Sequence, residues 1–378
     1  MKGVEADTKT LLYRGTDIDG VSIDPDRLEV RGRSITDLIG NVRFSEMTLL
    51  VLGDTKTDPV ALDHALLDRM EAVGPEHPAA LTAHAISAGG AGMPIAAMAG
   101  LCATTDADAA PLRTALPSLP KDAEFGLAVT AAVPGVIAAW RAARGKTRPS
   151  VAGAGFIQRS CGLNAETADV AACDLKVIED VMVGWTGGFG PLPPSVMIPR
   201  IAIGTGVSVQ HAVAAGFAAA GPLHIGATMQ AVGVLAAAQS GDGSSTDKDI
   251  ASLLDHMLAS GQMVGGFGHP LLNTDPRPPR IRSRAEELGS VHPIWGVYDK
   301  ACAHMQAKAN LRPNVDFACG AAMIAAGIRD PGTAAGLAMM ARSVGMTAHV
   351  LERKNRPAFG VRRQTARDHL NSFPTGWL

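Results

Sequence analysis

The segment "GGFGHPLLNTDPRPPR", residues 265–280, is too rich in Gly and Pro to form a helix. Three glycines precede His269, Pro270 follows it, and Arg277 ends an Asp-Pro-Arg turn. Glycine lets the backbone approach a ligand closely, and a proline restricts the conformation of the residue before it. The planar guanidinium of Arg277 suits a carboxylate. A surface turn is the plainer alternative, but the pattern predicts a loop shaped around an anionic ligand.

A second cluster, "AAGPLHIGATMQAV" (219–232), places His224 after Gly-Pro at the head of a predicted helix. The positive end of the helix dipole should lower the pKa of His224 and keep the imidazole neutral. A neutral imidazole can donate a hydrogen bond to a carbonyl oxygen without adding charge. A capping or core histidine is the alternative, because one histidine alone is weak evidence for a site.

A third cluster, "LRPNVDFACGAAM" (311–323), places Asp316 between Val315 and Phe317 at the start of a helix of small residues. Burial should raise the pKa of this carboxyl group while the helix end should lower it. That balance suits a base that is still ionised at neutral pH. An ordinary aspartate N-cap is the alternative.

The chain is basic from residue 342 onwards. Its charged residues there are Arg342, Arg353, Lys354, Arg356, Arg362, Arg363 and Arg367, against Glu352 and Asp368. A solvated basic tail is one interpretation. Capture of a polycarboxylate or a phosphate by some of these arginines is the other.

Composition narrows the class of protein. With 378 residues, 47% of them hydrophobic, the chain can form one large or two unequal domains. A net charge of −2 and few aromatic residues (4%) argue against nucleic-acid or acidic-membrane binding. Five scattered cysteines and no apolar leader predict a reduced, cytoplasmic protein without disulfides or a metal site. Abundant Ala and Gly favour closely packed helices over sheets.

Helix signals recur along the chain. Asp58 before Pro59 predicts a helix start, with Leu62, Leu66 and Met70 on one face. Other helices are expected from Ser45 to Gly53, from Asn164 to about Gly184, after a capping box at Thr246 and Asp249, and over 207–219, 226–239, 294–308, 317–328 and 332–345.

Two further segments complete the predicted elements. The apolar stretch Phe125–Trp140 is interrupted by Pro134 and is short for a membrane span, so we expect a buried helix. Strand-like alternation in "LLYRGTDI" (11–18) and "DRLEVRG" (26–32) predicts a small N-terminal hairpin. The fold class is therefore mainly α.

The three clusters, in this order, resemble the citrate synthase family, which includes citryl-CoA lyase relatives. "GPLHIGAT", "GFGHPLLNTDPR" and "NVDFACG" are similar to its GPLHGGAN, GxGHxxxxxxDPR and NVDFYSG elements, and "ARSVGMTAH" to its AR-x-x-GW-x-AH segment. Three more stretches also resemble the family: "VRGRSITDLIGNVRFSEMTLLVLGD", "GPEHPAALTAHAISAGG" and "AAVPGVIAAWRAARG". Seven matches in order are specific.

The resemblance implies an architecture and an assembly. A large helical domain would comprise residues 1–224 and 326–378, and a smaller domain, 225–325, would close over the substrate. The resemblance also implies a homodimer with shared active sites. Arg362 or Arg363 would reach the partner's site, although the family's RPR signature reads "GVRRQ" here.

The resemblance also implies a chemistry. Asp316 would abstract a proton from the α-carbon of an acyl-CoA while His224 donates a hydrogen bond to the thioester oxygen. His269 would polarise and protonate the ketone of a 2-oxo acid such as oxaloacetate, and Arg277 and Arg342 would hold its carboxylates.

By the same resemblance, CoA is a co-substrate, and no cofactor is covalently bound. Its adenine would lie against the glycine-rich loop, and Asn314 beside the pantetheine arm. The residues assigned to CoA are Gly265, Gly266, Phe267, Gly268 and Asn314.

Departures from the family pattern concentrate on the oxo-acid side. Phe189 or Gly190 occupies the place of a family histidine that binds the oxo acid, and neither side chain can donate a hydrogen bond. Thr228 replaces an asparagine, and Pro270 replaces a polar residue. Oxaloacetate is therefore expected to bind poorly, or the substrate carries an apolar group near Phe189. Two alternatives stay open: the lyase direction, and a catalytically idle CoA-ester-binding relative.

Overall fold

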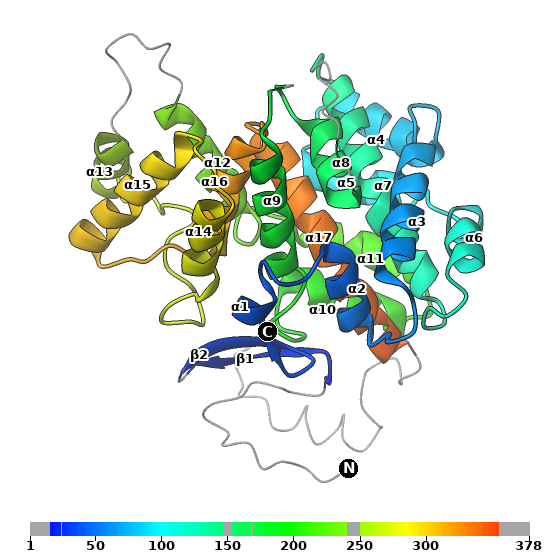
Figure 1. Cartoon of the computed structure of the whole chain (residues 1–378). Coiled ribbons are helices and arrows are strands. Elements are labelled where there is room, and N and C mark those ends of the chain that lie inside the picture. The colour runs from blue at the N-terminus through cyan, green and yellow to red at the C-terminus, as the bar shows by residue number, and fades with distance from the viewer. Residues whose placement is uncertain are drawn as a thin grey trace, which may run out of the picture.

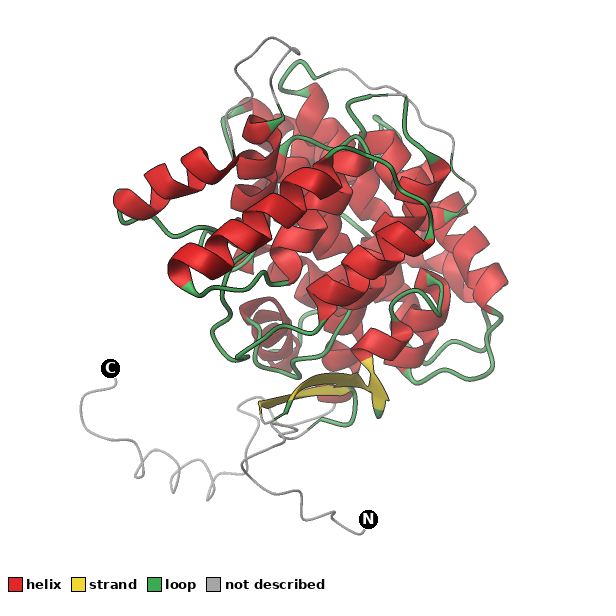
Figure 2. Cartoon of the chain, turned by 60° about the vertical axis from the view of Figure 1, so that its left-hand side comes forward, coloured by secondary structure: helices red, strands yellow, loops and turns green. Residues whose placement is uncertain are grey.

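The structure is a computed structural model that describes residues 16–23, 25–146, 153, 155–167, 169–239 and 250–354. Within these residues the chain is mainly helical, and the strands form one small sheet at the edge of the molecule (Figures 1 and 2). The predicted fold class is confirmed.

The helices in chain order are α1 (Ile35–Leu38), α2 (Phe44–Leu52), α3 (Pro59–Ala72), α4 (Pro78–Ala88), α5 (Met93–Leu101), α6 (Asp106–Ala115), α7 (Ala123–Ala142), α8 (Phe156–Asn164), α9 (Ala172–Trp185), α10 (Pro194–Gly204), α11 (Val209–Ala215), the 3-10 helix η1 (Gly216–Ala219), α12 (Gly226–Ala238), α13 (Ile250–Ala259), α14 (Arg277–Glu287), α15 (Ile294–Ala309), α16 (Val315–Ala325) and α17 (Pro331–Arg353). Figure 1 shows α12 to α16 on one side of α9 and α17, and α3 to α8 on the other.

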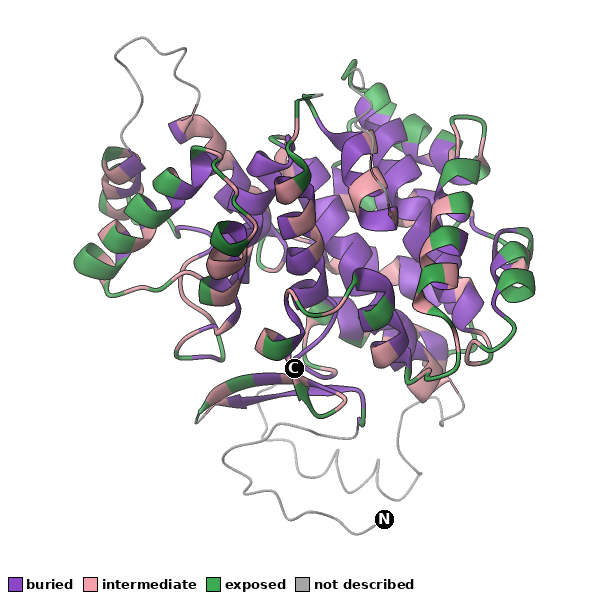
Figure 3. Cartoon of the chain, in the orientation of Figure 1, coloured by how far each residue is buried: buried purple, intermediate pink, exposed green. Residues whose placement is uncertain are grey.

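Two long helices, α7 and α17, pack against each other at the centre of the fold, where buried residues are concentrated (Figure 3). Small residues allow this close packing. A side chain at Gly126 would collide with Thr347, and one at Gly345 would collide with the backbone of Thr186. The abundance of Gly and Ala in the sequence therefore serves helix packing, as expected.

Helix α7 contains the apolar stretch predicted to be a buried helix. By length and composition it is the one helix among the described residues that could cross a membrane. Its most apolar window is 94% buried inside the structure, which is the pattern of a core helix.

A three-stranded antiparallel sheet of β1 (Asp19–Ile23), β2 (Asp26–Val30) and β3 (Arg33–Ser34) lies at the N-terminal end of the described chain. The predicted second strand matches β2, whereas β1 begins just after the segment predicted for the first. Residues 11–15 lie outside the described residues. Asp19 of β1 pairs with the buried His349 of α17 at 2.8 Å, so the sheet is attached to the core.

The helix starts were predicted with mixed success. Asp58 caps α3 by accepting hydrogen bonds from the backbone of Val60 and Ala61. Gly53 ends α2, as predicted, and adopts a left-handed conformation, but the helix begins at Phe44 with Arg43, not Ser45, as its N-cap. The prediction that Asn164 starts a helix is wrong, because Asn164 ends α8 and its buried amide donates to the carbonyl groups of Pro134 and Ser160. The capping box at Thr246 and Asp249 lies outside the described residues.

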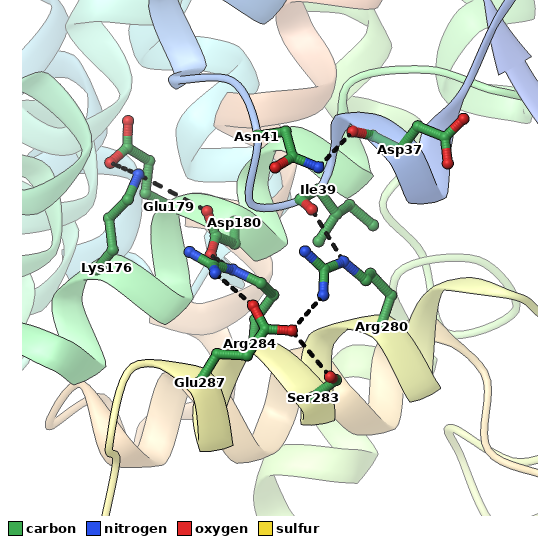
Figure 4. Close-up of polar contacts among 10 residues, drawn as sticks. All are labelled: Asp37, Ile39, Asn41, Lys176, Glu179, Asp180, Arg280, Ser283, Arg284 and Glu287. Carbon is green, nitrogen blue, oxygen red and sulfur yellow. Dashed lines mark hydrogen bonds and ion pairs between the residues drawn. The ribbon is translucent and has the colours of Figure 1, made fainter.

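Helix α14, which begins at Arg277, is attached to α9 and to the turn after α1 by polar contacts (Figure 4). Arg284 Nε donates to the fully buried carboxylate of Asp180 at 2.9 Å. Arg280 Nε donates to the carbonyl oxygen of Ile39 at 3.2 Å, and both arginines also contact Glu287. These contacts fix the helix whose first residue lies in the candidate site.

Candidate active site

The three sequence clusters meet at one cavity of about 550 Å³. Of the residues singled out from sequence, the lining includes Phe189, His224, Gly265, Gly266, Phe267, Gly268, His269, Arg277, Asn314, Asp316 and Arg342. Arg362 and Arg363 lie outside the described residues. Segments spread over residues 189–342 therefore face a common space.

The glycine-rich loop lies beside the start of α16 because the two segments pair through their backbones. Gly268 N donates to the Arg312 carbonyl at 2.9 Å, and Asn314 N donates to the Gly266 carbonyl at 2.8 Å. The Asn314 amide donates to the Gly268 carbonyl at 2.7 Å. Gly266 has a φ of +91°, and a Cβ there would lie 2.7 Å from Cβ of Phe317, so glycine is required.

Asp316 is the second residue of α16. The N-cap is Asn314, whose side chain accepts from the Asp316 backbone N–H at 2.9 Å, so the alternative of an Asp N-cap is wrong. Thr228 Oγ1, from the first turn of α12, donates to Asp316 Oδ1. Burial raises the pKa of Asp316 to about 6, and the hydrogen bond from Thr228 opposes this increase.

Arg277 lines the cavity, but its guanidinium is already paired. Its Nε and Nη2 donate to the two carboxylate oxygens of Asp275 at 2.9 and 2.7 Å, and its Nη1 donates to the Gly184 carbonyl at 3.3 Å. Asp275 Oδ2 also accepts from the Val315 backbone N–H at 2.8 Å. Arg277 is only 1% exposed, and this pair connects the Asp-Pro-Arg turn to the residue before Asp316.

His224 lies in the turn before α12, with its Nε2 2.9 Å from Oγ of the buried Ser195 on α10. Its pKa is lowered to about 4, first by burial and then by the positive charge of Arg342. The direction agrees with the sequence prediction. A neutral His224 whose Nε2 accepts from Ser195 carries its proton on Nδ1.

His269 accepts hydrogen bonds at Nδ1 from the backbone N–H groups of Leu271 and Leu272, at 3.1 and 3.0 Å. Burial, followed by the charge of Arg277, lowers the pKa of His269 to about 4. The ring is therefore neutral at pH 7, and because Nδ1 accepts, the proton is assigned to Nε2.

Arg342 of α17 is 4% exposed and lines the same cavity. Among the described residues its guanidinium has no hydrogen-bond or ion-pair partner, and its buried Nε is unsatisfied. Its Cζ lies 5.3 Å from the centroid of a Trp185 ring. Burial and then Arg277 lower its pKa to about 10, so it remains a cation at neutral pH.

Phe189 contacts both His269 and Arg277. Its ring stacks on that of His269, with centroids 5.2 Å apart and planes 16° apart. The Cζ atom of Arg277 lies 5.2 Å from the Phe189 ring centroid. The neighbouring residue Gly188 donates its backbone N–H to the carboxylate of Asp19 at 2.5 Å, so strand β1 holds this loop.

Four residues at the site had no role assigned from the sequence: Ser195, Thr228, Asp275 and Trp185. Each contacts a predicted residue: Thr228 and Asp275 lie within the predicted clusters, whereas Ser195 and Trp185 lie outside them. Only Asp275 carried a usable signal, because it stands two residues before Arg277 and its carboxylate can accept from that arginine.

The arrangement combines a carboxylate able to accept a proton, two neutral imidazoles able to donate hydrogen bonds, and a buried cation without a partner among the described residues. The described chain has no group of three or more His, Cys, Asp or Glu side chains placed to hold a metal ion. Proton transfer and binding of an anion are the chemistry that these groups can perform.

Comparison with known proteins identifies the matching family. Residues 3–362 match the family model described as "Citrate synthase, C-terminal domain". No curated protein sequence matches the chain.

Solved structures of citrate synthases share the fold. That of Thermoplasma acidophilum, a ternary complex with carboxymethyl coenzyme A and oxaloacetate, has a TM-score of 0.69 at 17% identity, covering 93% of this chain and 92% of that one. That of Pyrobaculum aerophilum has a TM-score of 0.66 at 21% identity, covering 93% and 89%. That of Thermotoga maritima has a TM-score of 0.64 at 19% identity, covering 93% and 92%.

Proposed function

Because the chain belongs to the citrate synthase family, we propose that it joins the α-carbon of an acyl-CoA, acetyl-CoA or a similar thioester, to the ketone carbon of a 2-oxo acid. It is an enzyme of the citrate synthase type that uses the CoA thioester as a substrate, without a covalently bound cofactor. The observation that supports the chemistry is the shared cavity of Asp316, His224 and His269.

Asp316 acts as the base. A thioester α-proton is only weakly acidic, so the carboxylate needs a raised pKa and simultaneous stabilisation of the enolate. Asp316 has a pKa of about 6, which makes it a stronger base than an ordinary aspartate while it is still ionised at pH 7. Among the described residues its Oδ2 makes no hydrogen bond, so Oδ2 is the oxygen that accepts the proton.

The two histidines act as neutral hydrogen-bond donors. We assign the Ser195 hydroxyl as the donor in its 2.9 Å contact with His224 Nε2, which leaves the Nδ1 proton of His224 for the thioester oxygen as enolate charge develops. His269 is fixed through Nδ1 and presents its Nε2 proton to the ketone oxygen of the oxo acid. The neutral His269 first donates a hydrogen bond to the ketone oxygen and can then transfer that proton to the alkoxide that forms.

CoA binds at the glycine-rich side of the cavity in this proposal. Gly265, Gly266, Phe267 and Gly268 let the backbone approach the adenine, and Asn314 lies at the same wall. In the synthase direction water then hydrolyses the condensed thioester and releases CoA. In the lyase direction the same base and donors would run carbon–carbon cleavage.

We also propose a homodimer, with the smaller domain, 225–325, closing over the site and Arg362 or Arg363 reaching the partner's cavity. An exposed apolar face supports the dimer. Its residues are Leu81 and Ile86 of α4, Ile95 of α5, Met197 and Ile201 of α10, and Val207 between α10 and α11. These helices are connected in space, because α5 contacts α4 and α11, and α10 contacts α11.

The dimer is tested by sedimentation of Ile201→Glu, which places a charge at the most exposed residue of this face. We expect a dimer for the parent protein and a monomer for the variant. Val60→Glu is the control, because Val60 is also an exposed apolar residue (42% against 62% for Ile201) but lies on α3, outside the face. A monomeric parent protein would contradict the dimer.

Activity is tested by following CoA release with a thiol reagent. The purified protein is given acetyl-CoA and a panel of 2-oxo acids, and separately citryl-CoA. Turnover that is lost in Asp316→Asn supports the proposal, and the substrate pair that reacts gives the direction. No turnover with any acid and none with citryl-CoA would favour a catalytically idle CoA-ester-binding protein.

A further inference from the structure

The loop that carries Phe189 lies close against strand β1, and its other residues are glycines. A Cβ at Gly187 would lie 3.0 Å from Oδ2 of Asp19, and one at Gly190 would lie 3.4 Å from the Asp19 carbonyl oxygen. Gly188 and Gly190 have φ values of +117° and +59°, a region that favours glycine. The backbone of this loop is therefore shaped to fit Asp19, and Phe189 is its one residue with a side chain.

Asp19 is a buried carboxylate, 3% exposed, whose two oxygens have different partners. Its Oδ2 accepts from the backbone N–H of Gly188 at 2.5 Å, and its Oδ1 lies 2.8 Å from Nε2 of His349 on α17. Burial opposes ionisation, but the contacts with His349 and Gly188 and the charge of Arg342 lower the pKa of Asp19. Asp19 is thus an ionised acceptor between α17 and the loop.

The orientation of His349 is fixed from its other side. Arg200 Nη1 lies 3.0 Å from His349 Nδ1, and a guanidinium can only donate, so Nδ1 accepts and the proton is assigned to Nε2, facing Asp19. Arg200 Nη1 also donates to Glu352 at 2.6 Å. Within the described chain none of these four residues lines the cavity. The network therefore supports the loop from behind the site.

Phe189 transmits this support to His269. The two rings stack with centroids 5.2 Å apart and planes 16° apart. The other constraint on the imidazole acts at its edge, where Nδ1 accepts from the backbone N–H groups of Leu271 and Leu272. The direction of the Nε2 proton lies in the ring plane, so it is set by both the edge contacts and the face contact with Phe189.

We propose that Asp19 is a positioning residue for the carbon–carbon bond step. By accepting from Gly188 it holds Phe189 in place, and the Phe189 ring keeps the His269 imidazole in the plane that aims Nε2 at the ketone oxygen. Asp19 itself contacts no substrate. This inference rests on the proposed function and adds a residue that lies outside all seven stretches resembling the family.

The first test is Asp19→Asn, which keeps the size of the side chain but replaces one acceptor oxygen with an amide that cannot accept from Gly188 or His349. We expect kcat for the carbon–carbon bond reaction to fall by about 10- to 100-fold, the loss that misplacement of a catalytic group causes. Asp17→Asn makes the same substitution at an exposed residue two positions earlier and should leave kcat unchanged.

Deuterium exchange into the acetyl-CoA methyl group separates positioning from stability. It is measured with a 2-hydroxy acid in place of the oxo acid, so that no ketone is present to condense. Because this step uses Asp316 and His224, Asp19→Asn should exchange at the parent rate. A merely structural role would lower exchange and kcat together, so equal losses of the two rates would overturn the inference, as would an unchanged kcat.

Phe189→Leu supplies a second, independent test, which also applies if Asp19→Asn does not fold. Loss of the stacked ring should lower kcat and leave exchange unchanged, and a parent-like kcat would overturn the inference. In the double variant, Asp19→Asn should cause little further loss, because both residues act through the same ring. Losses that multiply would show that Asp19 does not act through Phe189.

Failure of the inference is distinguishable from failure of the proposed function. A parent protein with exchange and carbon–carbon bond activity, together with equal losses of both in Asp19→Asn, contradicts only the positioning role. A parent protein without carbon–carbon bond activity contradicts the proposed function, and the inference with it.

Discussion

The hydroxyl of Thr228 on α12 donates a hydrogen bond to Oδ1 of Asp316 on α16. Thr228 is fully buried, so this donor does not compete with bulk water. The contact stabilises the ionised carboxylate while burial disfavours it, and together they set the pKa of Asp316 at about 6. It also engages one carboxylate oxygen and leaves the other for the substrate proton.

Thr228→Val should therefore shift the pH dependence of catalysis. Asp316 must be ionised to accept a proton, so kcat/KM should fall as the pH drops through about 6 in the parent protein. Loss of a hydrogen bond to the charged carboxylate should raise the pH at which kcat/KM falls by about one unit. Thr228→Ser keeps the hydroxyl and should leave the limb unchanged. Identical pH profiles of kcat/KM for the Val and Ser variants would contradict a role of the Thr228 hydroxyl in setting the pKa of Asp316.

Asp316→Asn should abolish turnover and yet stabilise the protein above neutral pH. The folded-state pKa of about 6 lies above the ordinary value of 3.8, so the folded protein binds the proton more tightly than the unfolded chain. Ionisation of Asp316 therefore lowers stability as the pH rises from about 4 to above 6.

The asparagine variant lacks this penalty. We expect it to be more stable than the parent by about 3 kcal/mol at pH 8, with little difference at pH 4. Denaturant titrations of both proteins at the two pH values measure this. A difference that is independent of pH would show that burial of the Asp316 charge has no such effect.

Arg342→Met should separate substrate binding from stability. The substitution removes a buried cation that has no partner among the described residues, so the free protein should be as stable as the parent or more stable. The KM for the 2-oxo acid should rise by about 10- to 100-fold, the equivalent of a charged hydrogen bond. Arg329→Met, an exposed arginine that contacts Gln239, is the control and should leave the KM unchanged.

Arg284→Met tests the attachment of α14 to α9 that Figure 4 shows. The variant leaves the fully buried Asp180 carboxylate without its close ion-pair partner, which should cost about 3 kcal/mol. Replacing both residues, as in Asp180→Leu with Arg284→Met, should cost less than the single change. Arg282→Met on the same helix is the control, because its partial exposure and exposed partners limit the loss to about 1 kcal/mol. Equal losses for Arg282 and Arg284 variants would contradict the role of the buried pair.

Much of the fold followed from local signals. The cap at Asp58, the glycine at 53 and the apolar stretch of α7 act within a few residues of themselves, and the structure has them as predicted. Asn164 was misplaced because its side chain satisfies the Pro134 carbonyl, a partner 30 residues away that no local pattern indicates.

The same difference between local signals and long-range contacts applies to the candidate site. The segments that carry His224, His269 and Asp316 were visible as Gly- and Pro-flanked clusters, and the structure brings them to one cavity. The neutralisation of Arg277 by Asp275 and the contact of Phe189 with both Arg277 and His269 depend on side-chain geometry. Sequence spacing indicates which residues approach one another, but not whether a charge is already paired when they meet.

The central claim is that Asp316 removes the α-proton of an acyl-CoA. The most direct measurement is deuterium incorporation into the methyl group of acetyl-CoA in D2O, followed by mass spectrometry with and without a 2-oxo acid. The account predicts rapid incorporation by the parent protein, loss of rate below a pH of about 6, and no incorporation above background for Asp316→Asn. Equal incorporation by the parent protein and Asp316→Asn would contradict it.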